Sequence, residues 1–377
     1  MNRYSKETQC VHSGTIVDRE DEGASSPLYP STSYGYLDKE IPVYPRYFNT
    51  KNQIAVAQKI SDLENAESGL VFSSGMAAIT STLYTFLSQG DHIIFQSALY
   101  GGTINFILKD LNRFGIQYTL VNSTYPEDFE KEIRENTRAL YIESPSNPLL
   151  RIIDLEALSR LAKANNILSI IDNTFASPVN QNPLDWWMDI VVHSATKYLN
   201  GHSDVTAGAV VSDKEKIGRI WETARNLGGS LDAHVCHLLE RSLKTLHIRV
   251  QAQNENALQV ARFLESHRQV QKVWYPGLES HIGHEVAEKQ MKGFGGMLSF
   301  EPVDNSIIQL QKRLELIRPA VSLGGIDTTI CSPALTSHKG LTQEEREKQG
   351  ISDSLLRLSV GIENADDLIR DLNQALG

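Results

Sequence analysis

Residues 170–204 read IIDNTFASPVNQNPLDWWMDIVVHSATKYLNGHSD, and this stretch is the most informative part of the chain. Asp172 closes an apolar, β-branched run, and Lys197 follows a second run that contains Val191 and Val192. Short apolar runs of this kind are typical of strands buried in a parallel sheet. Ligands of open α/β sheets bind at the carboxyl ends of such strands. We therefore expect Asp172 and Lys197 at one ligand-binding edge of a sheet.

Around this stretch, apolar runs alternate with segments of helical periodicity. Strands are predicted over 69–72, 92–96, 116–121, 139–143, 167–172, 189–192 and 207–212, and helices over 53–65, 76–87, 104–113, 126–136 and 155–165. This alternation predicts βαβ units and a mostly parallel central sheet covered on both faces. Beyond residue 213 the pattern changes to a long helical stretch over 231–267, strands at 270–274, 297–300 and 355–360, and a final helix over 365–376. The second pattern predicts a smaller C-terminal α+β domain.

The composition limits the class of protein. The 377 residues include 36 Lys+Arg and 46 Asp+Glu, a formal net charge of −10 that argues against a nucleic-acid partner. No apolar run approaches the ~18 residues that a membrane span needs. The three cysteines are far apart and odd in number, which favours a reducing compartment and hence the cytoplasm. We expect a cytoplasmic globular enzyme with two domains or with one large appendage.

The first fifty residues differ from the rest of the chain. They are rich in Pro, Tyr, Ser and charge and show no sustained helical or alternating period. Such a segment is either disordered or an arm that packs on another surface. The expected division is this N-terminal segment over 1–50, a large domain over 51–232 and a smaller domain over 233–377.

The polar residues of the first stretch suit pyridoxal phosphate. A lysine can form a Schiff base, the hydroxyls of Ser194 and Thr196 can bind the phosphate, and Asp172 can keep the pyridine nitrogen protonated. An ion pair with a carboxylate favours the charged form of that nitrogen. Strand-end Asp and Lys residues are also common as solvated loop residues, and these four residues alone leave both interpretations open.

Other segments add possible contacts. The strand, turn and helix start over 69–76 would present the backbone N–H groups of Ser74, Gly75 and Met76 to an anion, although a simple helix cap gives the same pattern. Tyr100 stands at a strand-to-helix junction, where its ring could stack on a planar ligand.

Arginines supply possible anion contacts. Tyr44 and Arg46, in the first fifty residues, offer a hydroxyl and a guanidinium group to a phosphate. Arg357 lies inside the apolar run 355–358 and needs a counter-anion, for which the carboxylate of an amino-acid substrate is suitable.

With these features the chain resembles the Cys/Met-metabolism family of pyridoxal-phosphate enzymes, which includes cystathionine γ-synthase, cystathionine γ- and β-lyases, methionine γ-lyase and the homoserine-ester sulfhydrylases. The most specific matching pieces are 172–174 and 194–204, and 73–78, 143–148, 322–325 and 350–361 support them. The resemblance covers nearly the whole chain. It implies an α/β fold of fold type I (aspartate-aminotransferase-like), with pyridoxal 5'-phosphate as cofactor.

The resemblance also implies roles for individual residues. Lys197 corresponds to the Schiff-base lysine that later moves protons along the substrate, and Asp172 to the partner of the pyridinium nitrogen. Tyr100 corresponds to the tyrosine that stacks on the ring and exchanges a proton with the leaving group. The further matching positions are Ser74, Gly75, Met76, Ser194 and Thr196 around the phosphate, and Asn147, Ser322 and Arg357 near the cofactor oxygen and the substrate carboxylate.

Tyr44 and Arg46 match a pair that reaches the phosphate of a neighbouring subunit. The resemblance thus implies that residues 1–50 are an intersubunit arm. It also implies a homo-oligomer of at least two subunits, and the family is usually a tetramer built from two dimers. Several positions depart from the family pattern, namely Pro45, the run 49–51 that lacks a proline, Gly102, Val321 and Asp327.

Among the possible reactions, the leading hypothesis is a carbon–sulfur lyase that acts on cystathionine, cysteine or methionine by β- or γ-elimination. Val321 favours it, because synthases of the family commonly carry Glu at that position. The alternative within the family is γ-replacement, by a cystathionine γ-synthase or an O-acylhomoserine sulfhydrylase. A non-catalytic relative with the same fold is the alternative from another class.

A metal site is not expected. His281 and His284, and likewise His234 and His237, are three residues apart on segments with helical periodicity, a spacing that suits a metal. No cysteine or carboxylate cluster completes a ligand set in the sequence, so we interpret them as surface or core histidines.

Overall fold

The computed structural model describes residues 4–304 and 306–377, and within these residues the strands form two sheets. The larger sheet has seven strands in the order β1-β7-β6-β5-β4-β2-β3. They are β1 (Ser68–Phe72), β2 (His92–Gln96), β3 (Gln117–Val121), β4 (Thr137–Glu143), β5 (Leu168–Asp172), β6 (Ile190–His193) and β7 (Gly208–Ser212). Only β7 runs antiparallel to its neighbours in this sheet, which confirms the predicted mostly parallel sheet.

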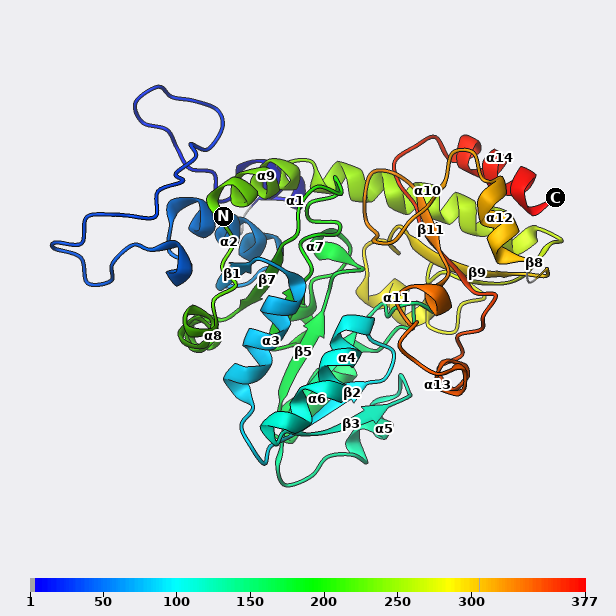
Figure 1. Cartoon of the computed structure of the whole chain (residues 1–377), viewed down its shortest axis with the longest axis horizontal. Coiled ribbons are helices and arrows are strands. Elements are labelled where there is room, and N and C mark those ends of the chain that lie inside the picture. The colour runs from blue at the N-terminus through cyan, green and yellow to red at the C-terminus, as the bar shows by residue number, and fades with distance from the viewer. Residues whose placement is uncertain (1–3, 305) are drawn as a thin grey trace.

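Helices cover both faces of this sheet (Figure 1). They are α2 (Lys51–Leu63), α3 (Gly75–Phe86), α4 (Gly101–Lys109), α5 (Pro126–Glu130), α6 (Leu155–Ala164), α7 (Ser177–Asn180), α8 (Lys214–Leu227) and α9 (Ala233–Leu243). Successive residues of each strand pack into separate cores on the two faces of the sheet. Ile171 and Val191 pack with α2, α6 and α9, whereas Ile170 and Val192 pack with α3, α4 and α8. This period-two burial explains the continuous apolar runs, because both faces of each strand are covered.

The smaller sheet has the strand order β10-β11-β12-β9-β8. Its strands are β8 (Val270–Trp274), β9 (Met297–Pro302), β10 (Arg318–Pro319), β11 (Thr329–Cys331) and β12 (Leu356–Ser359), and its helices are α11 (His284–Gln290), α12 (Ile307–Arg313), α13 (Gln343–Lys348) and α14 (Ala365–Leu376). The pairings β11–β12, β12–β9 and β9–β8 are antiparallel.

Helix α10 (Leu246–Ser266) runs from one sheet to the other along the top of Figure 1. Its first half buries Leu246 and Val250 in the core of the larger sheet. Its second half buries Val260 and Leu264 in the core of the smaller sheet. One rigid helix thus fixes the two sheets relative to each other, while the division at residue 232 stays a prediction.

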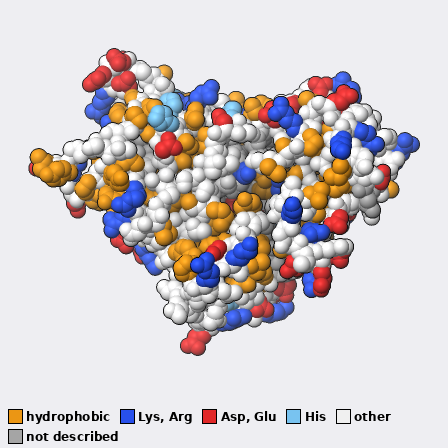
Figure 2. Space-filling model, in the orientation of Figure 1, with side chains coloured by type: hydrophobic (Ala, Val, Ile, Leu, Met, Phe, Trp, Pro, Cys, Tyr) orange, Lys and Arg blue, Asp and Glu red, His pale blue; other side chains and the backbone are white. Residues whose placement is uncertain are grey.

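The first fifty residues consist of a helix that packs on its own chain and a segment that extends from it, and their role as an intersubunit arm stays a prediction. Helix α1 (Lys6–His12) packs on the body of its own chain, where Cys10 joins the core and buried Lys59 donates to the carbonyl oxygen of Cys10 (3.0 Å). The segment that follows loops away from the body (Figure 1). It exposes several large apolar side chains, namely those of Val17, Leu28, Tyr36, Leu37, Ile41 and Tyr44. Figure 2 shows hydrophobic side chains at the protruding tip on the left.

Some predicted helices were wrong in extent. The periodic stretch 231–267 is two helices, because the chain turns at Lys244 and Thr245 between α9 and α10. The helix predicted over 126–136 ends at Glu130, where the chain turns to enter β4, and the N–H of Arg134 donates to Thr137 Oγ1 (2.8 Å). The helix predicted over 104–113 begins earlier, at Gly101, and gives way to a 3₁₀ turn at Leu111–Phe114.

None of the helices formed by the described residues is both long and apolar enough to cross a membrane.

Candidate active site

A cavity of about 590 Å³ lies beyond the carboxyl ends of β4, β5 and β6. Residues of the smaller sheet and of the segments 321–323 and 335–337 close it from the other side. The predicted site residues that line it are Gly75, Met76, Tyr100, Asn147, Asp172, Ser194, Thr196, Lys197, Ser322 and Arg357. The fold therefore brings together residues from seven separate parts of the sequence.

Lys197 lies in the turn that follows β6 and points into this cavity. Its Nζ donates to Ser322 Oγ at 2.8 Å. Burial, and then the nearby positive charge of Arg357, lower the pKa of Lys197 to about 8. The lower pKa leaves more of the amine uncharged near neutral pH, which is the form that attacks a carbonyl carbon.

Asp172 is the last residue of β5 and is 8% exposed. Its Oδ1 accepts hydrogen bonds from the backbone N–H (3.0 Å) and the hydroxyl of Thr174. Burial raises the pKa of Asp172, and the two donors of Thr174 act in the opposite direction. The carboxylate is thus placed in the cavity with donors that stabilise its charge.

The amino end of α3 forms the part of the cavity that suits an anion. Ser74 Oγ accepts the N–H of Ala77 at 3.1 Å, so Ser74 caps the helix and its side chain does not line the cavity. The N–H groups of Gly75 and Met76 belong to the first turn, whose backbone donors have no partner inside the helix. A Cβ at Gly75 would lie 2.9 Å from Ser194 Cβ, so only glycine allows this approach.

Thr196, by contrast, is engaged with the backbone: its Oγ1 accepts the N–H of Ala207 (3.0 Å) and donates to the carbonyl oxygen of Ala207 (3.2 Å). The donor set at this end, the backbone N–H groups of Gly75 and Met76 and the hydroxyl of Ser194, fits a phosphate group, and Thr196 lines the same cavity. Together with the lysine and the buried carboxylate, it fits the whole of pyridoxal phosphate.

Arg357 enters the cavity from β12 and is 5% exposed. Its Nη1 donates to Asn147 Oδ1 (2.7 Å) and its Nη2 to the carbonyl oxygen of Ser322 (3.3 Å). Its Nε is buried without a hydrogen-bond partner among the described residues. A buried guanidinium with a free donor is suited to the carboxylate of a ligand.

Tyr100 and Ser322 also line the cavity. Tyr100 precedes α4 and is 47% exposed, so its ring faces open space at the cavity. Ser322 has a φ of +80°, a left-handed conformation that is unfavourable for a residue with a side chain. This conformation accompanies the contact between Ser322 Oγ and the amine of Lys197.

Two residues of the site were missed from the sequence. Glu143, the last residue of β4, lines the cavity, and its Oε1 accepts the N–H of Tyr100 at 2.6 Å. Thr174 also lines the cavity, and besides its bonds to Asp172 its Oγ1 accepts the N–H of Ser194 (2.8 Å). Glu143 ends an apolar strand just as Asp172 does, so the same signal could have found it.

Tyr44 and Arg46 lie outside this cavity of their own chain. The guanidinium of Arg46 donates to the carbonyl oxygen of Arg225 and lies 5.1 Å from the ring centre of Tyr47. Their contact with a neighbouring subunit stays a prediction.

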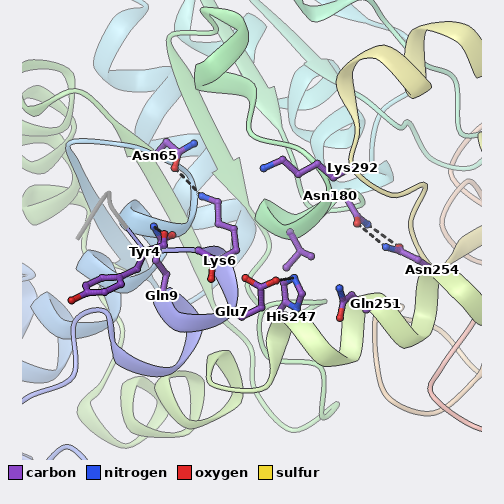
Figure 3. A pocket seen from close by; sticks show the side chains of 12 residues that line it. Tyr4, Lys6, Glu7, Gln9, Asn65, Asn180, His247, Gln251, Asn254 and Lys292 are labelled. Carbon is purple, nitrogen blue, oxygen red and sulfur yellow. Dashed lines mark hydrogen bonds and ion pairs between the residues drawn. The ribbon is translucent and has the colours of Figure 1, made fainter.

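A second hollow, of about 430 Å³, lies between α1, α7 and α10 (Figure 3). Its polar groups largely pair with one another: Lys6 Nζ donates to Asn65 Oδ1 (2.8 Å), and Glu7 Oε1 lies 3.2 Å from His247 Nε2. The amides of Asn180 and Asn254 bond to each other (3.0 and 2.8 Å). None of the residues selected from the sequence lines it, so we place the chemistry in the first cavity.

The histidine pairs do not form a metal site within the described part of the chain, where no three His, Cys, Asp or Glu residues are grouped to hold an ion. His284 opens α11, but His281 lies in the preceding turn and not on a helix, contrary to the prediction.

Comparison with known proteins decides the family. The family model described as "Cys/Met metabolism PLP-dependent enzyme" matches residues 7–377. The chain belongs to this family. It is 42% identical to the cystathionine beta-lyase of Lactococcus lactis subsp. cremoris over 376 residues (99% of each chain), and 42% identical to the L-methionine gamma-lyase of Fusobacterium nucleatum subsp. nucleatum over 392 residues (100% of this chain and 99% of that protein).

Among solved structures, it is similar to the cystathionine gamma-lyase of Lactobacillus plantarum complexed with L-serine. That match has a TM-score of 0.95 and 39% identity, and covers 99% of this chain and 98% of the other. The comparisons confirm the predicted family, the α/β fold of fold type I and the pyridoxal-phosphate cofactor. They also confirm the predicted class of enzyme, a carbon–sulfur lyase of this family acting on small amino-acid substrates.

Proposed function

We propose that this lyase holds pyridoxal phosphate on Lys197 and cleaves the carbon–sulfur bond of cystathionine, cysteine or methionine by β- or γ-elimination. One observation carries the proposal: Ser322 accepts a hydrogen bond from Lys197 through its hydroxyl and one from Arg357 through its carbonyl oxygen. The reactive amine and the carboxylate-binding group are therefore neighbours in one buried cavity.

Each residue of the cavity has its own role in the proposed reaction. Arg357 and Asn147 are placed to bind the α-carboxylate of the substrate, which leaves its α-carbon within reach of Lys197. Pyridoxal phosphate, when bound, supplies an electron-withdrawing ring that accepts the charge left at the α-carbon. Lys197 removes the α-proton, and Asp172 stabilises the positive charge of the ring nitrogen.

The outer part of the cavity supports elimination of a sulfur substituent. Val321, Leu335, Thr336 and Ser337 line it together with Tyr100. A thioether fits such a wall, and the phenol of Tyr100 is placed to give a proton to the departing sulfur. The relatives named as cystathionine and methionine lyases point to the same substrates.

A substrate panel tests this proposal. The enzyme is incubated separately with cystathionine, cysteine, methionine, and an O-acylhomoserine plus a thiol, and the keto acid and sulfur products are identified. We expect pyruvate from β-cleavage or 2-oxobutyrate from γ-cleavage of at least one thioether or thiol substrate. Reaction of the homoserine ester alone, with replacement by the thiol, would show that the enzyme is a γ-replacement enzyme instead.

We also propose a homo-oligomer, with a dimer as its unit and a tetramer of two dimers as its full form. The exposed apolar side chains of the protruding segment support this oligomer, because exposing such a surface to water is energetically unfavourable. In this arrangement Tyr44 and Arg46 reach the phosphate end of the neighbouring cavity. The three buried, unpaired cysteines agree with the cytoplasm as the proposed location.

A further inference from the structure

Two buried carboxyl groups stand side by side in the cavity. Glu143 and Asp172 are register partners on the adjacent parallel strands β4 and β5, so their side chains leave the same face of the sheet. They are 4% and 8% exposed, and both line the cavity. Two negative charges this close and this poorly solvated are strongly unfavourable, so only one of the two groups carries a charge.

The surroundings of the pair indicate which group is charged. Asp172 accepts both the backbone N–H and the hydroxyl of Thr174, whereas Glu143 accepts two backbone N–H groups, that of Tyr100 through Oε1 and that of Asn147. Burial, and next the negative charge of Asp172, raise the pKa of Glu143 well above its usual value. Asp172 therefore keeps the charge that the ring nitrogen of the cofactor needs, and Glu143 is neutral.

Glu143 is also the link between the sheet and Tyr100. Its own N–H donates to Gln96 Oε1 (3.0 Å), which fixes its backbone at the end of β4. Its Oε1 holds the N–H of Tyr100, the residue that begins α4, at 2.6 Å. The half-exposed ring of Tyr100 depends on this anchored main chain for its position, because much of the ring has no protein around it.

We propose that Glu143 is a positioning residue: its uncharged carboxyl group holds the main chain of Tyr100, and with it the tyrosine ring, without placing a second negative charge beside Asp172. Position 143 thus requires an uncharged group that accepts a hydrogen bond, and it does not require an acid. This inference rests on the proposed function in one respect only, namely that Tyr100 takes part in catalysis.

Replacing Glu143 by Gln, a neutral side chain of nearly the same shape, distinguishes a positioning role from an acid–base role. Glu143→Gln keeps an acceptor oxygen and no charge, so we expect kcat within about 3-fold of the unmodified enzyme. Glu143→Ala removes the anchor, and we expect kcat to fall about 10- to 100-fold with little change in KM, because the reacting groups lose their alignment. An equal loss of kcat in Glu143→Gln and Glu143→Ala would overturn the proposal, since it would mean that the acid itself is needed.

A double-mutant cycle tests the route through Tyr100. In a Tyr100→Phe background, which removes the phenol, Glu143→Ala is expected to cost much less than it does alone. Full additivity of the two losses would contradict a role that acts through this tyrosine.

Hydrogen exchange gives a readout that is independent of turnover. In the purified enzyme we expect Glu143→Ala to speed exchange of the Tyr100 amide at least about 10-fold, and Glu143→Gln to leave it nearly unchanged. Unchanged protection in Glu143→Ala would show that the carboxyl group does not hold this amide. If the substrate panel failed while these exchange results held, only the proposed reaction would be wrong.

Discussion

Lys197 is held where burial and the charge of Arg357 both disfavour its protonated form, with a pKa of about 8. Because this value lies below that of an ordinary lysine, about 10.4, the uncharged amine is already abundant at pH 8. We therefore expect the rate at which the cofactor-free enzyme recaptures pyridoxal phosphate to rise with pH, with a midpoint near 8. Stopped-flow absorbance over a series of pH values measures this rate.

Arg357→Gln provides the matched control for the same measurement. It removes the neighbouring positive charge, so the midpoint should move to higher pH while burial still keeps it below that of a free lysine. A midpoint above pH 10 in the unmodified enzyme, or no change in Arg357→Gln, would contradict this account of the site.

Asp172 offers a second prediction for a single side chain. Asp172→Asn keeps the shape and can still accept from Thr174, but it loses the negative charge opposite the ring nitrogen. We expect kcat to fall by about 10²- to 10³-fold with the fold retained, in line with the loss of one electrostatic contact in an active site. Steady-state kinetics together with circular dichroism would check both parts, and a loss below 3-fold would assign the charge-pairing role elsewhere.

Some of these residues could be predicted from the sequence and others could not. Asp172 and Lys197 end or follow apolar runs, so local pattern alone placed them at the edge of a sheet. The contact between Glu143 and Tyr100 joins residues 43 positions apart, and that between Arg357 and Asn147 joins residues 210 apart. Such contacts depend on how strands and domains pack, which periodicity does not encode.

At the scale of elements, the approach of α3 to the loop after β6 forms the end of the cavity that we propose binds the phosphate. Gly75→Ala would place a Cβ 2.9 Å from Ser194 Cβ, closer than side-chain carbons come, so the helix end must move away. We expect the affinity for pyridoxal phosphate to fall about 10-fold or more, measured by titration of the cofactor-free protein.

Gly218→Ala is the matched control for this change, because Gly218 lies within α8 and a Cβ there would meet only open space. It should leave cofactor affinity unchanged and stabilise the protein by about 0.4–1 kcal/mol, as expected for removing a helical glycine. Equal affinities in both variants would show that close packing at Gly75 is not required for the phosphate end.

The type of each long element was predictable, but its ends were less so. Strand β2 and helix α14 lie where the pattern placed them, because an apolar run marks the centre of the strand and a helical period marks the length of the helix. The turn between α9 and α10 was missed because the apolar period continues across it. Arg249 binds the carbonyl oxygens of Tyr198 (2.9 Å) and Ser242 (3.0 Å) beside this turn, and these are tertiary contacts.

At the scale of the whole molecule, the proposed shared active site predicts complementation between two inactive variants. On this proposal Arg46→Ala damages the contribution to the neighbour's site, and Lys197→Ala damages the enzyme's own site. In a hybrid dimer one of the two cavities then carries neither change. After subunit exchange of equal amounts, at a cofactor concentration where Arg46→Ala alone is inactive, we expect about a quarter of full activity from random pairing.

Size-exclusion chromatography with light scattering, run on the same mixture, shows whether subunits have assembled and exchanged. Activity that stays absent although exchange is complete would mean that each cavity is built from one chain alone. A monomer in solution would contradict the proposed oligomer directly.

Borohydride reduction of the purified enzyme identifies the lysine that carries the cofactor, which we propose is Lys197 in the cavity between the two sheets. Reduction fixes a lysine-bound cofactor as a stable secondary amine, which peptide mass spectrometry then locates. We expect one modified lysine, Lys197, with loss of the visible absorbance band. A phosphopyridoxyl group on another lysine, or none on Lys197 after complete reduction, would contradict it.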